Sequence, residues 1–211
     1  MKLSAVLLFY NSCLFVQFVD KNMDKKLKKR IEELVREEIV IVPYNPAWPK
    51  VFEDEAVFLR SKLPQNLVKR IEHFGSTAVP GLSAKPIIDI LVEVTSLEET
   101  KKQIVPILES EGYEYFWRPV HGNDGPPYYA WFIKRNSEGK RTHHIHMVEA
   151  DSERWIDLCF RDCLRQFPAE AKKYAELKTK LANEYPNDRV KYTEEKSSFI
   201  LSVTKKARSG S

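Results

Sequence analysis

The sequence predicts an α+β fold in which a mixed β-sheet is flanked by helices and carries a helical cap at its C-terminal end. Apolar and alternating segments of strand length are mixed with amphipathic helical patterns between residues 39 and 149. From Asp151 onward the pattern is helical throughout, which is the order typical of an α+β core followed by a cap. The length of 211 residues fits one domain. We expect this domain at residues 39–208, preceded by an extension at 1–38 that ends in an amphipathic helix.

Composition narrows the class of partner and the compartment. With 34 Lys and Arg against 30 Asp and Glu, the net charge is +4, which suits a small anionic ligand but not a dedicated nucleic-acid binder. The cysteines Cys13, Cys159 and Cys163 form no C-x-x-C motif. Cys159 and Cys163 lie on the apolar stripe of an expected helix, so we interpret both as core residues. This cysteine usage favours a reducing compartment, and we expect a cytoplasmic protein.

The N-terminal segment has two interpretations. Residues 3–19 are mostly apolar and faintly resemble a targeting signal, but polar residues interrupt them and no cleavage site follows. The segment is also short and polar for a membrane span, so membrane association is disfavoured. The alternatives are a targeting segment and an upstream extension, with Met23 as the natural start.

The elements are expected in the following order. Residues 24–38 form a charged amphipathic helix with a narrow apolar seam of Leu27, Ile31, Leu34 and Val35. Residues 39–42 form a short strand, and 47–63 a helix whose apolar residues share one face, as in a helix packed on a sheet. Further strands are expected at 67–74, 87–94, 113–118, 128–135 and 143–149, a helix at 97–111 that Gly112 stops, and three final helices broken near Pro168 and Pro186.

An acidic residue stands out within the central apolar strand. Asp89 lies in the run 87–94, and a buried carboxylate needs a partner. Alternate side chains share a strand face, so Asp89, Leu91 and Glu93 point one way. Asp89 and Glu93 are roughly 13 Å apart at about 3.3 Å per residue, too far to share one ion.

A histidine pair offers that partner. His144 and His146 share a face of the expected strand 143–149 and are roughly 6.6 Å apart, whereas His143 faces the other way. If this strand lies near the central one, Asp89, His144 and His146 form a two-histidine, one-carboxylate metal site. His73 adds a third imidazole near the same turn. The alternative is that the pair only satisfies buried polar groups through hydrogen bonds.

Several residues are candidates for binding phosphate. Gly75 and Ser76 follow a strand and offer backbone N–H groups and a hydroxyl, and Lys85 adds positive charge. Among the basic residues of the last helices, Arg161, Arg165, Lys178 and Lys196 are candidates if the tail folds back over the site. Tyr192 and Lys196 are one helical turn apart and can bracket an anion together. The alternative is an ordinary turn and solvated helix faces.

Over residues 42–207 the chain resembles the GrpB family. The resemblance rests on VPYNPAWPKVF, HFGSTAVPGLSAKPIIDILVEV and HHIHMV, and on FRDCLRQFP, YAELKTKLA and YTEEKSSFI near the C-terminus. The family is similar in fold to the nucleotidyltransferase superfamily, in which a Gly-Ser pair holds a nucleotide phosphate and two carboxylates on the next strand bind magnesium. The resemblance therefore implies that Gly75 and Ser76 bind phosphate and that Asp89 binds a divalent metal, expected to be Mg²⁺. Leu91 stands where the second carboxylate would be.

Three functions follow as hypotheses. In the first, the protein is a metal-dependent nucleotidyltransferase with Asp89 and His146 as catalytic residues, and His144 or His146 replaces the missing ligand. In the second, the pocket binds a nucleotide or another phosphorylated small molecule without turning it over, because Leu91 removes a metal ligand. The third is a chaperone-like partner domain linked to coenzyme A metabolism, which the family's resemblance to an extra domain of some dephospho-CoA kinases implies.

Overall fold

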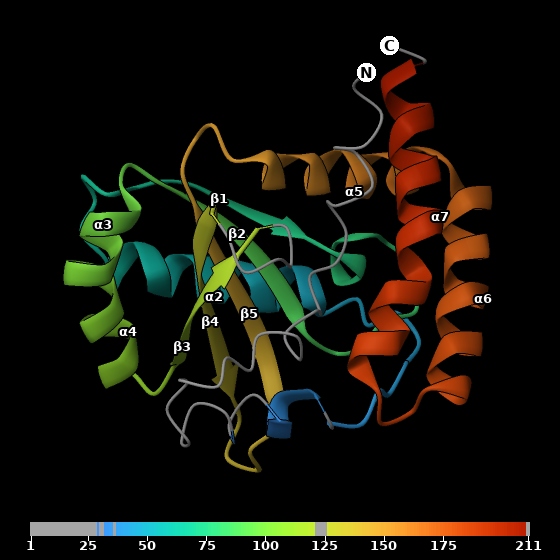
Figure 1. Cartoon of the computed structure of the whole chain (residues 1–211), viewed down its shortest axis with the longest axis horizontal. Helices are drawn as coiled ribbons and strands as arrows, with labels where there is room; N and C mark the ends of the chain where they lie inside the picture. The colour runs from blue at the N-terminus through green and yellow to red at the C-terminus, as the bar shows by residue number, and fades with distance from the viewer. Residues whose placement is uncertain (1–28, 30–31, 36, 121–125, 210–211) are drawn as a thin grey trace.

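In the computed structural model, five strands form one mixed sheet with helices on both faces (Figure 1). The structure describes residues 29, 32–35, 37–120 and 126–209, with side chains up to residue 206. Residues 3–19 with their two interpretations, Cys13 and most of the expected helix 24–38 lie outside the described residues. Of the described residues of that helix, 29 and 32–35 are helical whereas 37 and 38 are not, so the helix ends earlier than expected; Leu34 is buried as its place in the seam predicts.

The sheet has the strand order β1-β2-β5-β4-β3. Its strands are β1 (Val68–Phe74), β2 (Ile88–Val94), β3 (Glu114–Pro119), β4 (Tyr128–Arg135) and β5 (Arg141–Val148). The central pair β2 and β5 is parallel, whereas the other three pairs are antiparallel. The parallel pairing matters for function because it brings the strand of Asp89 beside the strand of the histidine pair.

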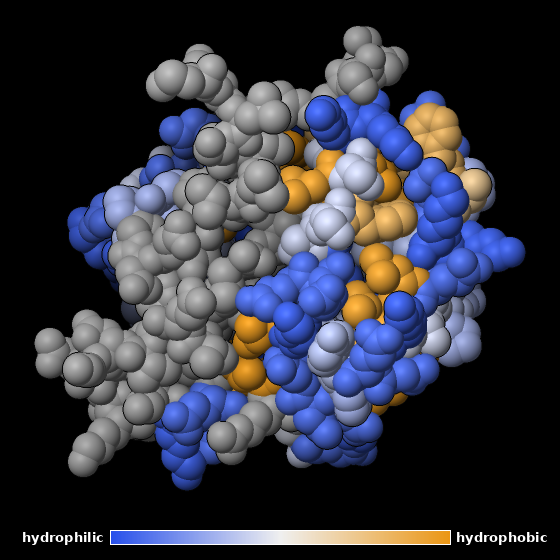
Figure 2. Space-filling view, turned by 45° about the vertical axis from the view of Figure 1, so that its right-hand side comes forward, coloured by the Kyte–Doolittle hydropathy of each residue, from blue (hydrophilic) through white to orange (hydrophobic). Residues whose placement is uncertain are grey.

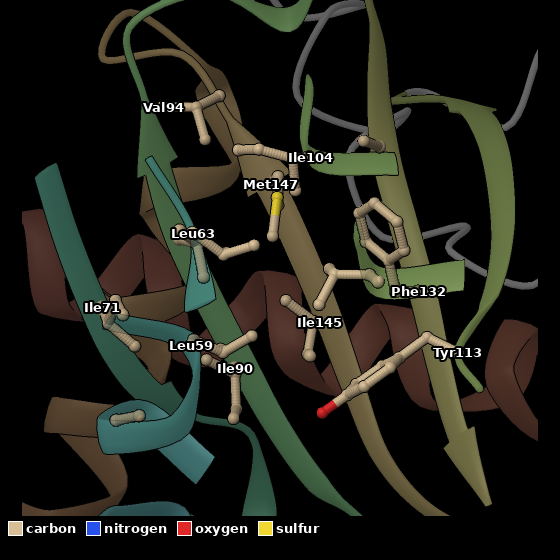
Figure 3. Packing of buried hydrophobic residues seen from close by; sticks show 14 of the residues in the cluster. Leu59, Leu63, Ile71, Ile90, Val94, Ile104, Tyr113, Phe132, Ile145 and Met147 are labelled. Atoms are coloured by element: carbon tan, nitrogen blue, oxygen red, sulfur yellow. The ribbon is translucent and has the colours of Figure 1, made fainter. Parts of the chain in front are cut away.

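One face of the sheet packs against α2 (Trp48–Lys62) and α4 (Val105–Ser110). Leu59 and Leu63, from α2 and its C-terminal end, meet Ile90, Ile145 and the neighbouring strand residues in one apolar cluster (Figure 3). Leu59 and Ile90 have no exposed area. This face therefore forms the main hydrophobic core, as the helical spacing of 47–63 predicts.

The other face carries the C-terminal helices. They are α5 (Ile156–Gln166), α6 (Pro168–Glu184) and α7 (Arg189–Ser209), after a 3₁₀ turn at Glu153–Trp155. Helices α6 and α7 lie side by side at the right of Figure 1. Pro168 begins α6 because a proline is tolerated in the first turn and disfavours helix in the residue before it. The predicted helical cap and its breaks are confirmed.

Two local predictions are wrong. Residues 39–42 form no strand among the described residues; only Val42 makes a single bridge, to Ala84, because Pro43 cannot extend the pairing. Cys159 is exposed, whereas Cys163 is buried as predicted. Cys159 lies at the edge of the α5 stripe, where the helix turns toward solvent.

The helix expected at 97–111 is continuous but irregular. It consists of α3 (Leu97–Glu99), a π-helical stretch (Thr100–Ile104) and α4. Pro106 explains the wider turn, because a proline has no N–H to donate to the carbonyl four residues earlier. Gly112, with φ +84°, follows the end of α4 as predicted.

The surface over the C-terminal helices is largely hydrophilic, with smaller apolar areas between the hydrophilic residues (Figure 2). The exposed large hydrophobic residues of the described chain are Val40, Val51, Val57 and Phe167. Such scattered residues are normal for a protein surface. In the part of the chain that the structure describes, no helix is both long enough and apolar enough to cross a membrane.

Candidate functional site

A pocket of about 220 Å³ lies on the sheet face that also carries the C-terminal helices. Its lining comes from β2, β5, the turn after β1, α6 and α7, and it includes Leu34 and Val35 of the N-terminal segment. Asp89, His144 and His146 lie in it together with Gly75, Ser76, Lys85, Lys178 and Lys196. The structure thus brings the three candidate metal ligands into one pocket with most of the candidate phosphate ligands of the sequence analysis; Arg161 and Arg165 lie outside it.

The parallel register of β2 and β5 positions the metal-ligand candidates. Asp89 pairs with His144 and Leu91 with His146, so all three candidates rise from one sheet face. The Nδ1 atom of His144 is 3.1 Å from Oδ1 of Asp89. One ligand atom from each of Asp89, His144 and His146 lies within 4.8 Å of the others.

These three residues fit a divalent ion. Two ligands of a tetrahedral zinc ion with bonds of about 2.1 Å lie roughly 3.4 Å apart, so side-chain shifts of up to about 1.4 Å would bring the three ligand atoms onto one ion. Nε2 of His144 and Nδ1 of His146 are buried and have no hydrogen-bond partner among the described residues. Buried polar atoms normally have a partner, so these two nitrogens are suited to a ligand outside the chain.

Electrostatics keeps the imidazoles in the form that binds metal. Burial, together with the charge of Arg141, lowers the pKa of His144 well below its usual value. Burial and the charge of Arg154 do the same to the pKa of His146. Both rings are therefore neutral near pH 7, as a metal ligand must be. Burial also raises the pKa of Asp89, although the charge of Lys85 opposes this effect.

Aromatic side chains hold the histidine rings in place. Tyr129 stacks on His146 with 5.5 Å between ring centroids, and Phe74 meets the same ring edge-on at 5.2 Å. Trp131 contacts His144 edge-on at 5.2 Å. Packing of this kind limits ring rotation and presents the nitrogens in fixed directions.

Gly75 lies directly against the carboxylate of Asp89. It has φ +72° and ψ −170°, a conformation that is essentially restricted to glycine. A Cβ added to Gly75 would be 2.5 Å from Oδ2 of Asp89. The glycine of the Gly-Ser pair is thus required by the close approach of the turn to Asp89.

Positive charge dominates the wall of the pocket. Seven cationic residues line it against two carboxylates, Asp89 and Asp157: the cations are Lys85, Arg118, Arg141, Arg154, Lys178, Arg189 and Lys196. Such an excess in a concave site attracts anionic ligands. Sequence reasoning missed the four arginines and Asp157, which only the chain's topology brings to the pocket.

The three lysines are held against aromatic rings and backbone. Lys85 and Lys196 lie over the ring of Tyr192, at 5.4 Å and 4.1 Å from its centroid. Lys178 donates to the carbonyl of Ser83 and is 2% exposed. Burial lowers the pKa of Lys178 well below its ordinary value. Lys85 and Lys196 are therefore the better candidates for charge on a phosphate.

Other predicted residues lie elsewhere. His73 points to the opposite sheet face, where it stacks on Phe52 at 4.8 Å and its Nε2 is 3.0 Å from Oγ1 of Thr77. It therefore does not join the set of Asp89, His144 and His146. Arg161 bonds to Glu72 and to the carbonyl of His73, outside the pocket lining.

Arg165 also lies outside the pocket lining, and its guanidinium donates to the carbonyl of Ala78. Leu91 is fully buried in the apolar cluster of this face. Asp157 of α5, which does line the pocket, accepts a hydrogen bond from Arg154 at 2.9 Å. Burial raises the pKa of Asp157. The second carboxylate of the pocket therefore comes from a helix, not from β2.

Comparison with known proteins gives one family. The family model described as "GrpB protein" matches residues 38–206. The glutamate-rich protein GrpB of Alkalihalophilus pseudofirmus is 38% identical over 164 residues, covering 77% of this chain and 92% of that protein. A UPF0157 protein of Pseudomonas aeruginosa is 41% identical over 170 residues, covering 80% of this chain and 67% of the relative.

The chain is also similar to a solved structure of the same family and, over a shorter stretch, to a kinase. The crystal structure of the conserved protein GrpB from Enterococcus faecalis has a TM-score of 0.70 and 38% identity, covering 81% of this chain and 98% of that one. A dephospho-CoA kinase of Mycolicibacterium paratuberculosis is 33% identical over 85 residues, covering 38% of this chain and 20% of the kinase.

Proposed function

Since the chain belongs to the GrpB family, we propose that its pocket binds a nucleotide or another phosphorylated small molecule together with one divalent metal ion. The observation that carries the proposal is the position of Asp89, His144 and His146 inside a pocket with seven cationic residues. A metal ligand set and a surplus of positive charge in one concave site suit a phosphorylated ligand.

The donor atoms bear on the choice of metal. Mg²⁺ prefers oxygen ligands, whereas imidazole suits zinc, iron, copper and nickel. Two imidazoles and one carboxylate therefore fit a transition metal such as zinc better than the magnesium that the family resemblance implies. A bound ion of this kind would polarise a phosphoryl oxygen. Asp89, His144 and His146 would hold it, and magnesium stays an untested prediction.

The phosphate would lie between the turn and α7. Ser76 lines the pocket on the turn, while Lys85 and Lys196 converge on Tyr192 from two elements. Thr77 is less suited, because its hydroxyl donates to the carbonyl of Ile87 and meets His73. We therefore assign Ser76, Lys85 and Lys196 to the ligand's phosphate.

Nucleotidyl transfer and simple binding remain alternatives. A two-metal transfer site needs carboxylates that share ions about 4 Å apart, and Leu91 supplies none. One metal site favours either chemistry with a single ion or binding without turnover. The similarity to part of a dephospho-CoA kinase makes coenzyme A precursors natural ligands to test.

Calorimetric titration tests the proposal. The protein is titrated with inorganic phosphate, nucleotides and coenzyme A precursors, each with and without zinc, manganese or magnesium. Lys85→Ala is expected to lower the affinity for the phosphorylated ligand by roughly 10-fold, the change expected when one charge-assisted hydrogen bond is lost. Lys50→Ala, an exposed lysine of α2, serves as the control and should change nothing. Equal affinity in Lys85→Ala and wild type would refute the assignment.

A further inference from the structure

Glu37 of the N-terminal segment lies among three arginines, two of which line the pocket. One carboxylate oxygen of Glu37, Oε2, is 2.6 Å from Nε of Arg141 and 3.5 Å from Nη2 of Arg189. The other oxygen accepts a hydrogen bond from Arg135 at 2.7 Å. Three guanidinium groups from β4, β5 and α7 thus converge on one side chain.

Two of these arginines also belong to the pocket. Arg141 and Arg189, called the arginine pair below, line it together with Asp89 and His144. Each is 8% exposed. Their guanidinium groups donate to main-chain carbonyls of the segment, Arg141 to Leu34 at 2.6 Å and Arg189 to Glu37 at 3.0 Å. The pair therefore joins the pocket to the segment.

The two arginines of the pair lie close together around one carboxylate. Arg135 has a second carboxylate, because Glu114 accepts from its Nε at 2.5 Å. Both arginines of the pair contact the carboxylate of Glu37, which also accepts a hydrogen bond from Arg135. Burial and the charge of Arg189 lower the pKa of Arg141 to about 10, which reflects the cost of holding two buried cations together. Two guanidinium groups in this arrangement are suited to a phosphate dianion, which offers them three acceptor oxygens.

The matched GrpB region contains the arginine pair but not Glu37. The GrpB match begins at residue 38 and includes Arg141 and Arg189, but not Glu37. Glu37 does not line the pocket itself but a neighbouring hollow beside Arg135, and 28% of its side-chain area is exposed, so solvent reaches this side chain. A phosphate can replace the carboxylate of Glu37 in these contacts, because a guanidinium group binds phosphate and carboxylate in the same forked geometry.

We propose that Arg141 and Arg189 form a second anion subsite of the pocket, which Glu37 occupies as an internal carboxylate until a phosphate of the ligand displaces it. This inference rests on the proposed function, since it assigns a further phosphate or carboxylate group of the same ligand. The N-terminal segment then sets the affinity of the pocket through Glu37.

The test compares pyrophosphate affinity in wild type, Glu37→Gln and Glu33→Gln by calorimetry at constant salt. Glu33 is the matched control: it lies on the same segment and pairs with Lys29 at the surface. Glu37→Gln is expected to bind pyrophosphate about 10-fold more tightly, the change that corresponds to one net charge-assisted hydrogen bond. In the double variant Glu37→Gln, Arg189→Gln this gain in pyrophosphate affinity should be lost.

The outcomes separate the two proposals. Pyrophosphate binding that Lys85→Ala weakens but Glu37→Gln leaves unchanged would overturn the subsite and keep the proposed function. An equal gain in Glu33→Gln would overturn it too, as a general charge effect. Absence of binding in both wild type and Glu37→Gln would overturn both proposals. If Glu37→Gln melts below the assay temperature, Arg189→Gln alone decides: weaker binding supports the subsite, and unchanged binding overturns it.

Discussion

Replacement of Gly75 by alanine probes the geometry of the site most sharply. At φ +72° and ψ −170°, Gly75 occupies a conformation that costs a residue with a side chain about 1–3 kcal/mol. The new Cβ would also be 2.5 Å from Oδ2 of Asp89, closer than such atoms approach each other. Asp89 must therefore move, which costs roughly another 1 kcal/mol.

The magnitude follows from these two terms. Gly75→Ala should lower the free energy of unfolding by roughly 2–4 kcal/mol. For a chain of this size each kcal/mol lowers Tm by about 2–4 °C, so the melting temperature should fall by roughly 4–16 °C. Because Asp89 is displaced, the variant should also lose most of the stabilisation that we expect added zinc to give the wild type.

Urea denaturation and thermal melts with and without zinc provide the assay. Gly81→Ala is the matched control, because Gly81 also has positive φ, +77°, but an added Cβ meets no atom within 4 Å. It should cost about 1 kcal/mol and leave the zinc effect intact. If Gly75→Ala were no more destabilising than Gly81→Ala and kept the zinc effect, the contact between Gly75 and Asp89 would not constrain the site.

Two further predictions concern the opposite face of the sheet. Tyr113 donates to the buried carboxylate of Glu55, so Tyr113→Phe should cost about 1–3 kcal/mol in urea denaturation, and a loss near zero would contradict this reading. Burial lowers the pKa of His73 to about 4, below its usual 6.5. On acidification the unfolded chain therefore binds a proton at His73 at a higher pH than the folded chain does. The free energy of unfolding should fall as the pH drops from 6.5 to 4, by up to about 3 kcal/mol. His73→Gln should flatten this slope, whereas an unchanged slope would assign the acid sensitivity to other groups.

The sequence predicts the elements well where one physical rule decides them. The spacing of apolar residues predicts α2, and the prolines predict the breaks before α6 and α7. The apolar run at residues 39–42 wrongly predicts a strand, because only Val42 pairs with another segment, through a single bridge to Ala84. The spacing of apolar residues in α5 wrongly predicts that Cys159 is buried, because the buried stripe of this helix is narrower than the apolar spacing indicates.

The candidate site could be predicted only in part. Alternation along the strands places Asp89 on one face of β2, and His144 and His146 on one face of β5. Their proximity depends on the parallel pairing of β2 with β5, which no local pattern reveals. The pocket arginines come from β3, β5, α7 and the turn before α5, far apart in sequence. Their arrangement is a property of the tertiary fold, and so is the contact of Glu37 with Arg141.

Spectroscopic titration with Co²⁺ tests the central claim, that Asp89, His144 and His146 form one metal site, most directly. We predict that one equivalent of Co²⁺ gives a visible d–d absorption band, which is lost when both His144 and His146 are replaced by alanine. His143→Gln is the control, because this neighbouring histidine faces Glu55 on the other side of the sheet. It should keep the band. A spectrum that is the same in wild type and in the double variant would contradict the account.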